Sequence, residues 1–92
     1  MELRELRTFS AVAKLRSISK GAEALGIGQP TATTHVKKLE QELGRPLFDR
    51  VKRPIHLTLA GASLARLATP LVEEIDALAA KTSLAEEEGP VS

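Results

Sequence analysis

The sequence contains no cysteine, no tryptophan and no tyrosine, and two phenylalanines are its only aromatic residues. Without cysteine the chain forms neither disulfides nor thiolate metal sites, and a reducing compartment is compatible with it. Single-stranded RNA is disfavoured as a partner, because its recognition depends on aromatic side chains that stack on bases. We predict no cofactor and no metal, because His35 and His56 lack a nearby carboxylate at ligand spacing.

Long apolar runs and catalytic clusters are also absent. The first residues carry charges at Glu2, Arg4, Glu5 and Arg7, so the sequence predicts neither a secretion signal nor a membrane-spanning helix. It has no pair of carboxylates near a histidine and no glycine-rich phosphate loop after a strand. We therefore expect a cytoplasmic protein that is not an enzyme and has no small-molecule site.

Charge is distributed unevenly along the 92 residues, a length that suits one small domain or a domain with an extended element. The net charge is only +1, yet residues 1–57 hold eleven Lys and Arg against six Asp and Glu, whereas residues 58–92 hold two against six. This asymmetry is typical of a basic binding module followed by an acidic segment with another role.

The N-terminal part of the chain has the periodicity of two helices joined by a turn. Apolar residues recur at three- and four-residue spacing, which predicts an amphipathic helix over 2–15. Ser17 or Ser19 can then cap a short helix that continues through Leu25. Gly26 provides a left-handed stop and leads into the next segment.

A third helix is predicted over 29–43, with two different faces. Four apolar residues fall within a narrow arc at about 100° per residue and form its buried stripe: Ala32, Val36, Leu39 and Leu43. The opposite side carries Pro30, Thr34, Lys37 and Gln41, flanked by Thr33 and Lys38. Gly44 ends the helix, and a small hairpin with a basic turn is predicted from about 46 to 57.

From Thr58, which can cap it, the pattern changes to one long helix over 59–86. Its apolar residues alternate spacings of four and three, as in a coiled-coil seam: Leu64, Ala68, Leu71, Ile75 and Leu78. A lone helix cannot bury that seam, so we expect dimerisation, with packing onto the domain's own first helix as the alternative. Pro70 predicts a kink rather than a break, because the apolar pattern keeps its phase across it. The acidic end, 87–92, is predicted to be a flexible tail.

Together these elements describe a mainly α fold: a winged helix-turn-helix over 1–58, with three helices and a small two-stranded wing, followed by a long dimerisation helix. A recognition helix meets the major groove of DNA with its N-terminal residues, so that end must be slim. Gln29 can pair with adenine, and Pro30 and threonine methyls can contact thymine methyls. The stretch "GIGQPTATTH" then trades helix propensity for close approach to bases.

Three motifs occur in order along the chain: "AEALGIGQP", "LEQELGRPLFDR" and "LTLAG". In combination they make residues 1–88 resemble the N-terminal DNA-binding region of LysR-type transcriptional regulators. The resemblance implies that double-stranded promoter DNA is bound at an interrupted inverted repeat by a homodimer formed through linker helices, with higher oligomers in a full-length relative. It also implies a C-terminal effector-binding domain of the periplasmic-binding-protein type, for which these residues have no counterpart.

The same resemblance implies roles for single residues. Gln29 and Pro30 match the base-contacting pair at the start of the recognition helix, and Thr33 stands where a Ser or Thr usually contacts DNA. Arg50 matches a wing arginine close to phosphates, and Arg53 matches one that reaches into the minor groove. The helix start and the wing thus form one predicted DNA-binding surface.

Two positions depart from the family pattern. Gly28 stands where a capping Ser is common, and Thr34 stands where Arg is frequent, so a hydroxyl and a long basic side chain are missing. The predicted base contacts are Gln29, Pro30, Thr33, Thr34 and Arg53. The predicted contacts to the DNA backbone are Ser19, Gly28, Thr31, Lys37, Lys38, Arg50 and Lys52.

Two other interpretations stay open. A winged-helix module can instead bind a protein through its coil and basic face. The salt dependence of binding distinguishes the two cases, because binding to duplex DNA weakens steeply with added salt and a dry protein interface does not. Among DNA binders, the alternative is a winged helix like that of molybdate regulators, which starts similarly but lacks this wing ending. The basic turn and polar helix start can also be ordinary solvated surface.

Overall fold

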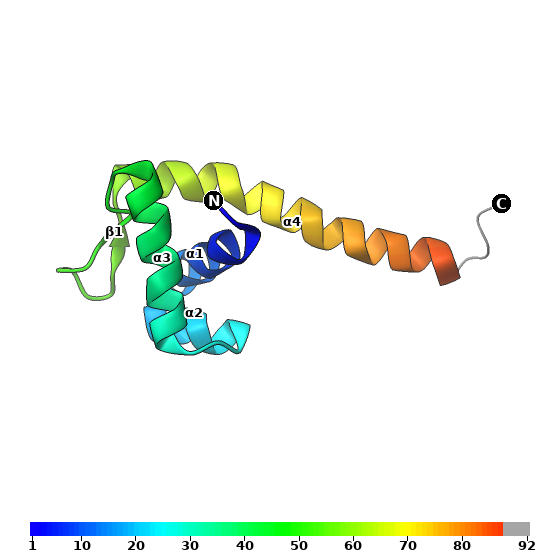
Figure 1. Ribbon diagram of the computed structural model, residues 1–92, viewed down its shortest axis with the longest axis horizontal. Helices are drawn as coiled ribbons and strands as arrows, with labels where there is room; N and C mark the ends of the chain where they lie inside the picture. Colours follow the sequence, from blue (N-terminus) through cyan, green and yellow to red (C-terminus); the bar gives the residue numbers. More distant parts are fainter. Residues whose placement is uncertain (88–92) are drawn as a thin grey trace.

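The computed structural model describes residues 1–87, which form four helices and a two-stranded sheet (Figure 1). The elements follow in the order α1 (Leu3–Leu15), α2 (Ile18–Leu25), α3 (Gln29–Leu43), β1 (Phe48–Asp49), β2 (His56–Leu57) and α4 (Leu59–Glu87). The predicted winged helix-turn-helix and long final helix are confirmed. Of the tail predicted over 87–92, residues 88–92 lie outside the described part of the chain.

The turns between the helices are fixed by local chemistry. Ser17 caps α2, since its Oγ accepts a hydrogen bond from the backbone N–H of Lys20 at 3.2 Å. The hydroxyl of Ser19 lies 3.1 Å from that of Ser17. Gly26 and Gly44 follow α2 and α3 with φ of 68°, the left-handed conformation that glycine adopts without strain. Both predicted glycine stops are confirmed.

The core lies where α1, α3 and the wing meet. Its buried side chains are Phe9, Val12, Val36, Leu39, Leu47 and Phe48. The rings of Phe9 and Phe48 tie α1 to the wing, with centroids 5.4 Å apart and planes inclined by 45°. Gly21 lets α2 approach α1 closely, because an added Cβ would lie 2.7 Å from a methyl of Val12. This packing holds the start of α3 at one end of the domain.

The predicted buried stripe of α3 is correct for three of its four residues. Ala32, Val36 and Leu39 are fully buried, but the prediction was wrong for Leu43, whose side chain is 42% exposed. Leu43 is the last residue of α3 and lies beyond the buried core cluster that covers the middle of the helix. Periodicity identifies a helix face but not the point at which neighbouring elements stop covering it.

Helix α4 is joined to the domain by tight contacts at its first turn. Thr58 caps it as predicted, because its Oγ1 accepts from the backbone N–H of Gly61 at 3.0 Å and donates to the carbonyl of Pro46 at 2.7 Å. Gly61 is buried against Leu47, whose carbonyl oxygen would overlap an added Cβ. Beyond this junction α4 continues without a break through Pro70 and projects away from the domain (Figure 1).

Candidate nucleic-acid interface

The first turn of α3 stands open on the surface of the domain. Gln29, Pro30 and Thr31 are exposed, and Gly28 at the N-cap has no side chain to close the helix end. The first amides of a helix have no intrahelical acceptor, so the missing N–H of Pro30 costs little. The result is the slim helix end that entry into a major groove requires.

The two threonines of the next turn differ in what they can offer. Thr33 is half-buried, whereas Thr34 is exposed and donates its hydroxyl proton to the carbonyl of Pro30 at 3.0 Å. A hydroxyl has one proton, so this side chain has none left for a phosphate in that arrangement. Its methyl group suits a contact with a thymine methyl.

The wing is a short antiparallel hairpin that carries its charges in the loop. Phe48 pairs with Leu57 and Asp49 with His56, and the predicted hairpin is therefore confirmed, with only two residues in each strand. The exposed loop that joins the strands contains the basic residues Arg50, Lys52 and Arg53. The short strands leave most of the hairpin as a loop that presents these cations.

The wing arginines are held by partners within the chain. The guanidinium of Arg53 donates to the backbone carbonyls of Arg50 and Lys52. Arg50 donates to Glu40 Oε1 at 3.2 Å, with 42% of its side chain exposed. These bonds use Nη1 of Arg53, and both arginines stay exposed at the surface of the domain.

An open cleft of about 610 Å³ lies between the wing and the starts of α2 and α3. It brings together four of the predicted contact residues, Ser19, Gln29, Arg50 and Arg53, although they are far apart in the sequence. Two more basic residues, Arg16 and Lys20, line the same cleft and were missed in the sequence analysis. Their positive charge was the only available signal, because nothing in the periodicity places α2 beside the wing.

Glu40 is a third residue that sequence reasoning missed. Its Oε2 accepts from the backbone N–H of Leu47 at 2.8 Å while its Oε1 accepts from Arg50, and only 13% of its side chain is exposed. One carboxylate thus joins the C-terminal half of α3 to both the start of the wing and its basic loop. A lone glutamate on a helix gives no sequence signal for this role.

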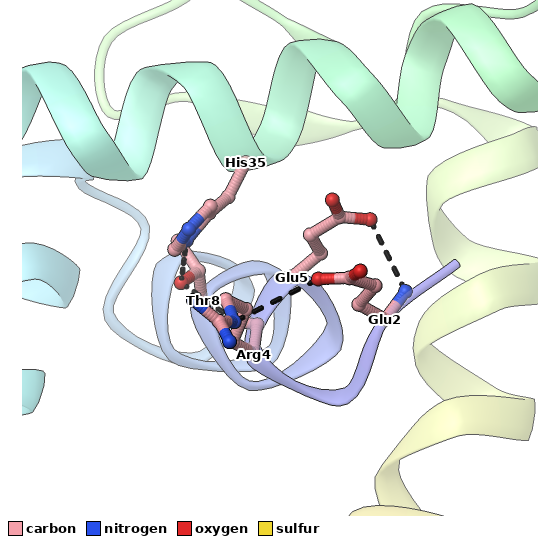
Figure 2. A network of polar contacts seen from close by, with 5 residues as sticks. All are labelled: Glu2, Arg4, Glu5, Thr8 and His35. Carbon is pink, nitrogen blue, oxygen red and sulfur yellow. Dashed lines mark hydrogen bonds and ion pairs between the residues drawn. The ribbon is translucent and has the colours of Figure 1, made fainter.

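On its other side, α3 faces the N-terminal turns of α1 across a smaller cleft of about 310 Å³. The residues that line it from α3 are Pro30, Thr31, Thr34, His35 and Lys38, and those from α1 are Glu2, Arg4 and Glu5. His35 Nδ1 lies 2.7 Å from Thr8 Oγ1, a contact between the two helices (Figure 2). Four predicted contacts line neither cleft: Gly28, Lys37 and Lys52, which are exposed, and Thr33, which is half-buried.

The predicted dimerisation seam divides into two parts along α4. Ala68 is buried at 2% exposure, and Leu64 is partly buried against the core of its own domain. These two residues pack within the chain, which the alternative interpretation predicted for the whole seam. Leu71, Ile75 and Leu78 are 55%, 43% and 64% exposed. With Leu3 and Leu6 they line a largely apolar groove of about 530 Å³. Of the five predicted seam residues, these three distal ones therefore present apolar surface to a partner.

An ion pair joins α1 to the distal half of α4. Arg7 lies 2.6 Å from Asp76, with 34% and 54% of the two side chains exposed. The hydrogen bond from Arg7 holds the pKa of the Asp76 carboxyl below its usual range, and the same bond raises the pKa of Arg7. Both groups are therefore charged at neutral pH.

The described residues, 1–87, contain neither a membrane-spanning helix nor a metal-binding cluster. No helix there is both long and apolar enough to cross a lipid bilayer. Within the same range, no group of three or more His, Asp or Glu side chains is arranged to hold a metal ion.

Known proteins with similar sequences and structures have the same module. HTH-type transcriptional regulator BudR of Klebsiella aerogenes is 52% identical over 66% of this chain and 43% of its own length, and BudR of Raoultella terrigena is 43% identical over 89% and 28%. The chain thus spans less than half the length of these curated relatives. The BenM DBD/catB site 1 DNA complex matches with a TM-score of 0.84 and 37% identity, over 90% of this chain and 92% of that one.

The family model described as "Bacterial regulatory helix-turn-helix protein, lysR family" matches residues 3–62. This segment runs from the start of α1 to the first turn of α4 and includes the whole candidate interface. Since the match covers more than half of the sequence, the chain belongs to the lysR family of bacterial regulatory helix-turn-helix proteins.

Proposed function

We propose that the chain is the DNA-binding part of a cytoplasmic transcription regulator, which binds duplex DNA sequence-specifically as a dimer and performs no catalysis. The observation that carries the proposal is the exposed first turn of α3 beside a cleft lined by Lys20, Arg50 and Arg53. A helix end reads base edges in the major groove, while cations on its flank bind phosphates and fix its position. The likeness to the BenM complex with DNA supports the same assignment.

The base-reading roles follow from the chemistry of each side chain. Gln29 offers an amide that pairs with the N6 and N7 of adenine. Pro30, Thr33 and Thr34 offer apolar groups for thymine methyls, and the bond from Thr34 to the carbonyl of Pro30 favours that use of its methyl. Arg53 offers a guanidinium for the minor groove, with Nη2 and Nε as donors besides the Nη1 that bonds two carbonyls.

Contacts with the sugar-phosphate backbone surround this reading surface. We assign them to Ser19, Gly28, Thr31, Lys37, Lys38, Arg50 and Lys52, and add Arg16 and Lys20 from the cleft. Gly28 contributes through the open helix end, where backbone N–H groups and the helix dipole favour an anion. The other groups supply hydroxyl protons or positive charge.

Dimerisation is proposed through the distal half of α4. The side chains of Leu71, Ile75 and Leu78 follow the spacing of a coiled-coil seam and keep 55%, 43% and 64% of their surface exposed beside Leu3 and Leu6 of their own domain. A pair of such helices fixes the distance between two recognition helices, which then enter successive major grooves on one side of the duplex.

Selection from a random duplex library tests the proposal, because it reports half-site sequence, spacing and stoichiometry together. We expect an inverted repeat bound by two chains, with an affinity that falls steeply as salt is added. A selected pool without any shared half-site, together with binding to a protein that is insensitive to salt, would instead identify a protein-interaction module.

Two variants separate base reading from backbone binding. Gln29→Ala should lose about 1–3 kcal/mol of discrimination at one base pair, and Arg53→Ala should weaken binding more evenly and lower the salt slope by about one. Gln41→Ala and Arg66→Ala are matched controls, since these exposed side chains lie on α3 outside its first turns and on α4. A Gln29→Ala protein with unchanged sequence preference would exclude the base-reading role.

A further inference from the structure

A polar contact joins α1 to α3 beside an otherwise apolar core. Thr8 Oγ1 lies 2.7 Å from His35 Nδ1 and also donates to the carbonyl of Arg4 at 3.0 Å (Figure 2). Thr8 is only 1% exposed and is one of the few polar side chains buried in the domain. A buried polar group of this kind is stabilising only while its partners stay in place.

The proton count defines how the contact works. The Thr8 hydroxyl has one proton, and the backbone carbonyl of Arg4 can only accept, so that proton belongs to the bond with Arg4. Both contacts are hydrogen bonds at the same time only when Thr8 accepts from His35 and the imidazole carries a proton on Nδ1. In that arrangement the neutral ring is the Nδ1–H tautomer, and its plane is fixed by an acceptor on another helix.

His35 stands among the side chains to which DNA contacts are assigned. It lies one helical turn after Thr31 and directly follows Thr34, and both line the same cleft as the imidazole. A shift of the ring relative to α1 therefore shifts these two threonines as well. Threonine side chains are short, so the position of the helix itself decides whether they reach a base.

The first turn of α3 is buried at Ala32 but has no polar anchor of its own. Gly28 provides no side-chain cap, and the other polar anchors of the helix, Glu40 and Glu42, connect its opposite half to the wing and to the N-terminus of the chain. Recognition groups must be held within about 0.5 Å and 10–20° of their productive geometry. The contact of His35 with α1 therefore adds, near the first turns, a directional restraint on the rotation of α3 to those given by its buried stripe and by Glu40 and Glu42.

We propose that Thr8 and His35 are positioning residues for base recognition: their hydrogen bond sets the rotation of α3 against α1 and thereby places Thr31 and Thr34 on the DNA. The inference rests on the proposed DNA-binding function and deepens it. Neither residue needs to touch DNA for this role. The contact acts on specificity, because non-specific phosphate binding tolerates a small rotation that base contacts do not.

The test measures the ratio of affinities for the selected operator and for a scrambled duplex at one salt concentration. Thr8→Val keeps the shape of the side chain and removes its hydroxyl, so we expect this ratio to fall at least about threefold (~0.7 kcal/mol) while scrambled-duplex affinity changes less than twofold. Thr8→Ser and His35→Asn keep an acceptor and a donor at these positions and should retain the ratio within about twofold of wild type.

Ser10→Ala is the matched control, because it also removes a hydroxyl from α1, and the Ser10 Oγ has no hydrogen-bond partner within the described residues. It should leave the ratio unchanged. If Thr8→Val lowers only the melting temperature and keeps the wild-type ratio, the contact is purely structural and the inference is overturned. If the wild-type protein itself does not prefer the operator, both the proposed function and the inference fail.

A second measurement does not depend on whether the variants fold. Nitrogen-15 chemical shifts of the His35 imidazole in the wild-type protein, at a pH where the ring is neutral, report which nitrogen carries the proton. A proton on Nδ1 supports the donor assignment. A proton on Nε2 alone would mean that the ring accepts from Thr8, and the proposed geometry would be wrong.

Discussion

The winged domain over 1–58 and helix α4 use apolar residues in opposite ways. In the domain, Phe9, Leu39 and Leu47 are fully buried in one core cluster. On α4 beyond Ala68, Leu71 and Ile75 keep about half of their side chains exposed to solvent, although they continue the same regular spacing. The apolar residues of the domain are therefore covered within one chain, whereas those of the distal half of α4 keep about half of their surface exposed, as the proposed seam requires.

Charge separates the two regions in the same way. Residues 1–57 have an excess of five positive charges, whereas residues 58–92 have an excess of four negative charges. A basic surface attracts phosphates, and an acidic helix beside it does not compete for the same partner. The comparison indicates that recognition and assembly are assigned to separate parts of the chain, and this separation can be tested by variants.

The largest expected effect comes from Leu71→Arg on α4. Leu71 is 55% exposed, so the substitution should leave each winged domain folded while it places a charge in the proposed seam. We expect sedimentation to report a monomer. Affinity for an operator with two half-sites should fall by about 10²-fold or more, because binding through two linked modules gains roughly 10²–10⁴ over one.

Ala77→Arg is the control, because it adds the same charge to an exposed position of α4 outside the seam. This variant should remain a dimer with nearly unchanged affinity. An intact Leu71→Arg dimer would contradict the assignment of assembly to the distal half of α4, and the domain itself would then be the place to look for the interface.

The next largest effect is expected at Gly61, where the two regions join. Alanine usually favours a helix over glycine by about 1 kcal/mol, but at Gly61 its Cβ would overlap the carbonyl oxygen of Leu47 and lie 2.9 Å from a methyl of Leu57. Overpacking of this kind costs about 1–3 kcal/mol. We therefore expect Gly61→Ala to lower the free energy of unfolding by about that amount in denaturant titrations.

Ser63→Ala, an exposed change in the same turns of α4, should stay within about 0.5 kcal/mol of wild type. If Gly61→Ala were as stable as wild type, α4 could move away from the wing without loss. The first turn of α4 would then not be fixed to the wing, and the rigid domain would end before Gly61.

These contacts show which properties the sequence could predict. Helix boundaries followed from local signals, namely periodicity, the Ser17 cap and the glycine stops, and the structure agrees with them. Which residues line the cleft beside the wing depends instead on how the helices pack in three dimensions. Nothing local indicates that Arg16 and Lys20 lie beside Gln29, or that Glu40 bonds the chain seven residues later.

Whether an apolar helix face is buried also depends on the packing of the neighbouring elements. The same apolar spacing was correct for Leu39 and wrong for Leu43, because the neighbouring elements end before the helix does. In α4 the spacing predicted one continuous seam, and the domain covers only its first part, at Leu64 and Ala68. Periodicity shows which residues can be buried, and the arrangement of the other elements decides which of them are.

The smallest expected effect concerns the ion pair between the two regions. The Arg7 hydrogen bond lowers the pKa of Asp76 from its ordinary value of 3.8, so the pair stabilises the folded chain above that pH. Its contribution is lost as the pH falls through the lower pKa of the folded state. We expect a carbon-13 NMR titration of the Asp76 carboxyl to show the depressed pKa, and Arg7→Ala to raise it towards 3.8.

Arg4→Ala is the matched control, because Arg4 pairs with Glu2 at 3.7 Å on the same helix, and the Asp76 titration should not respond to its loss. An Asp76 pKa at its ordinary value in the wild-type protein would mean that the arm does not rest on α1 in solution, and an equally low pKa in Arg7→Ala would mean that Arg7 is not the cause of the shift. Exposed ion pairs contribute little to stability. A rise of the Asp76 pKa in Arg7→Ala would therefore show where α4 lies, and not that the ion pair holds it there strongly. That position matters for the proposed dimer, because the groove beside Asp76 is lined by Leu3 and Leu6 of the domain as well as by Leu71 and Ile75 of the arm.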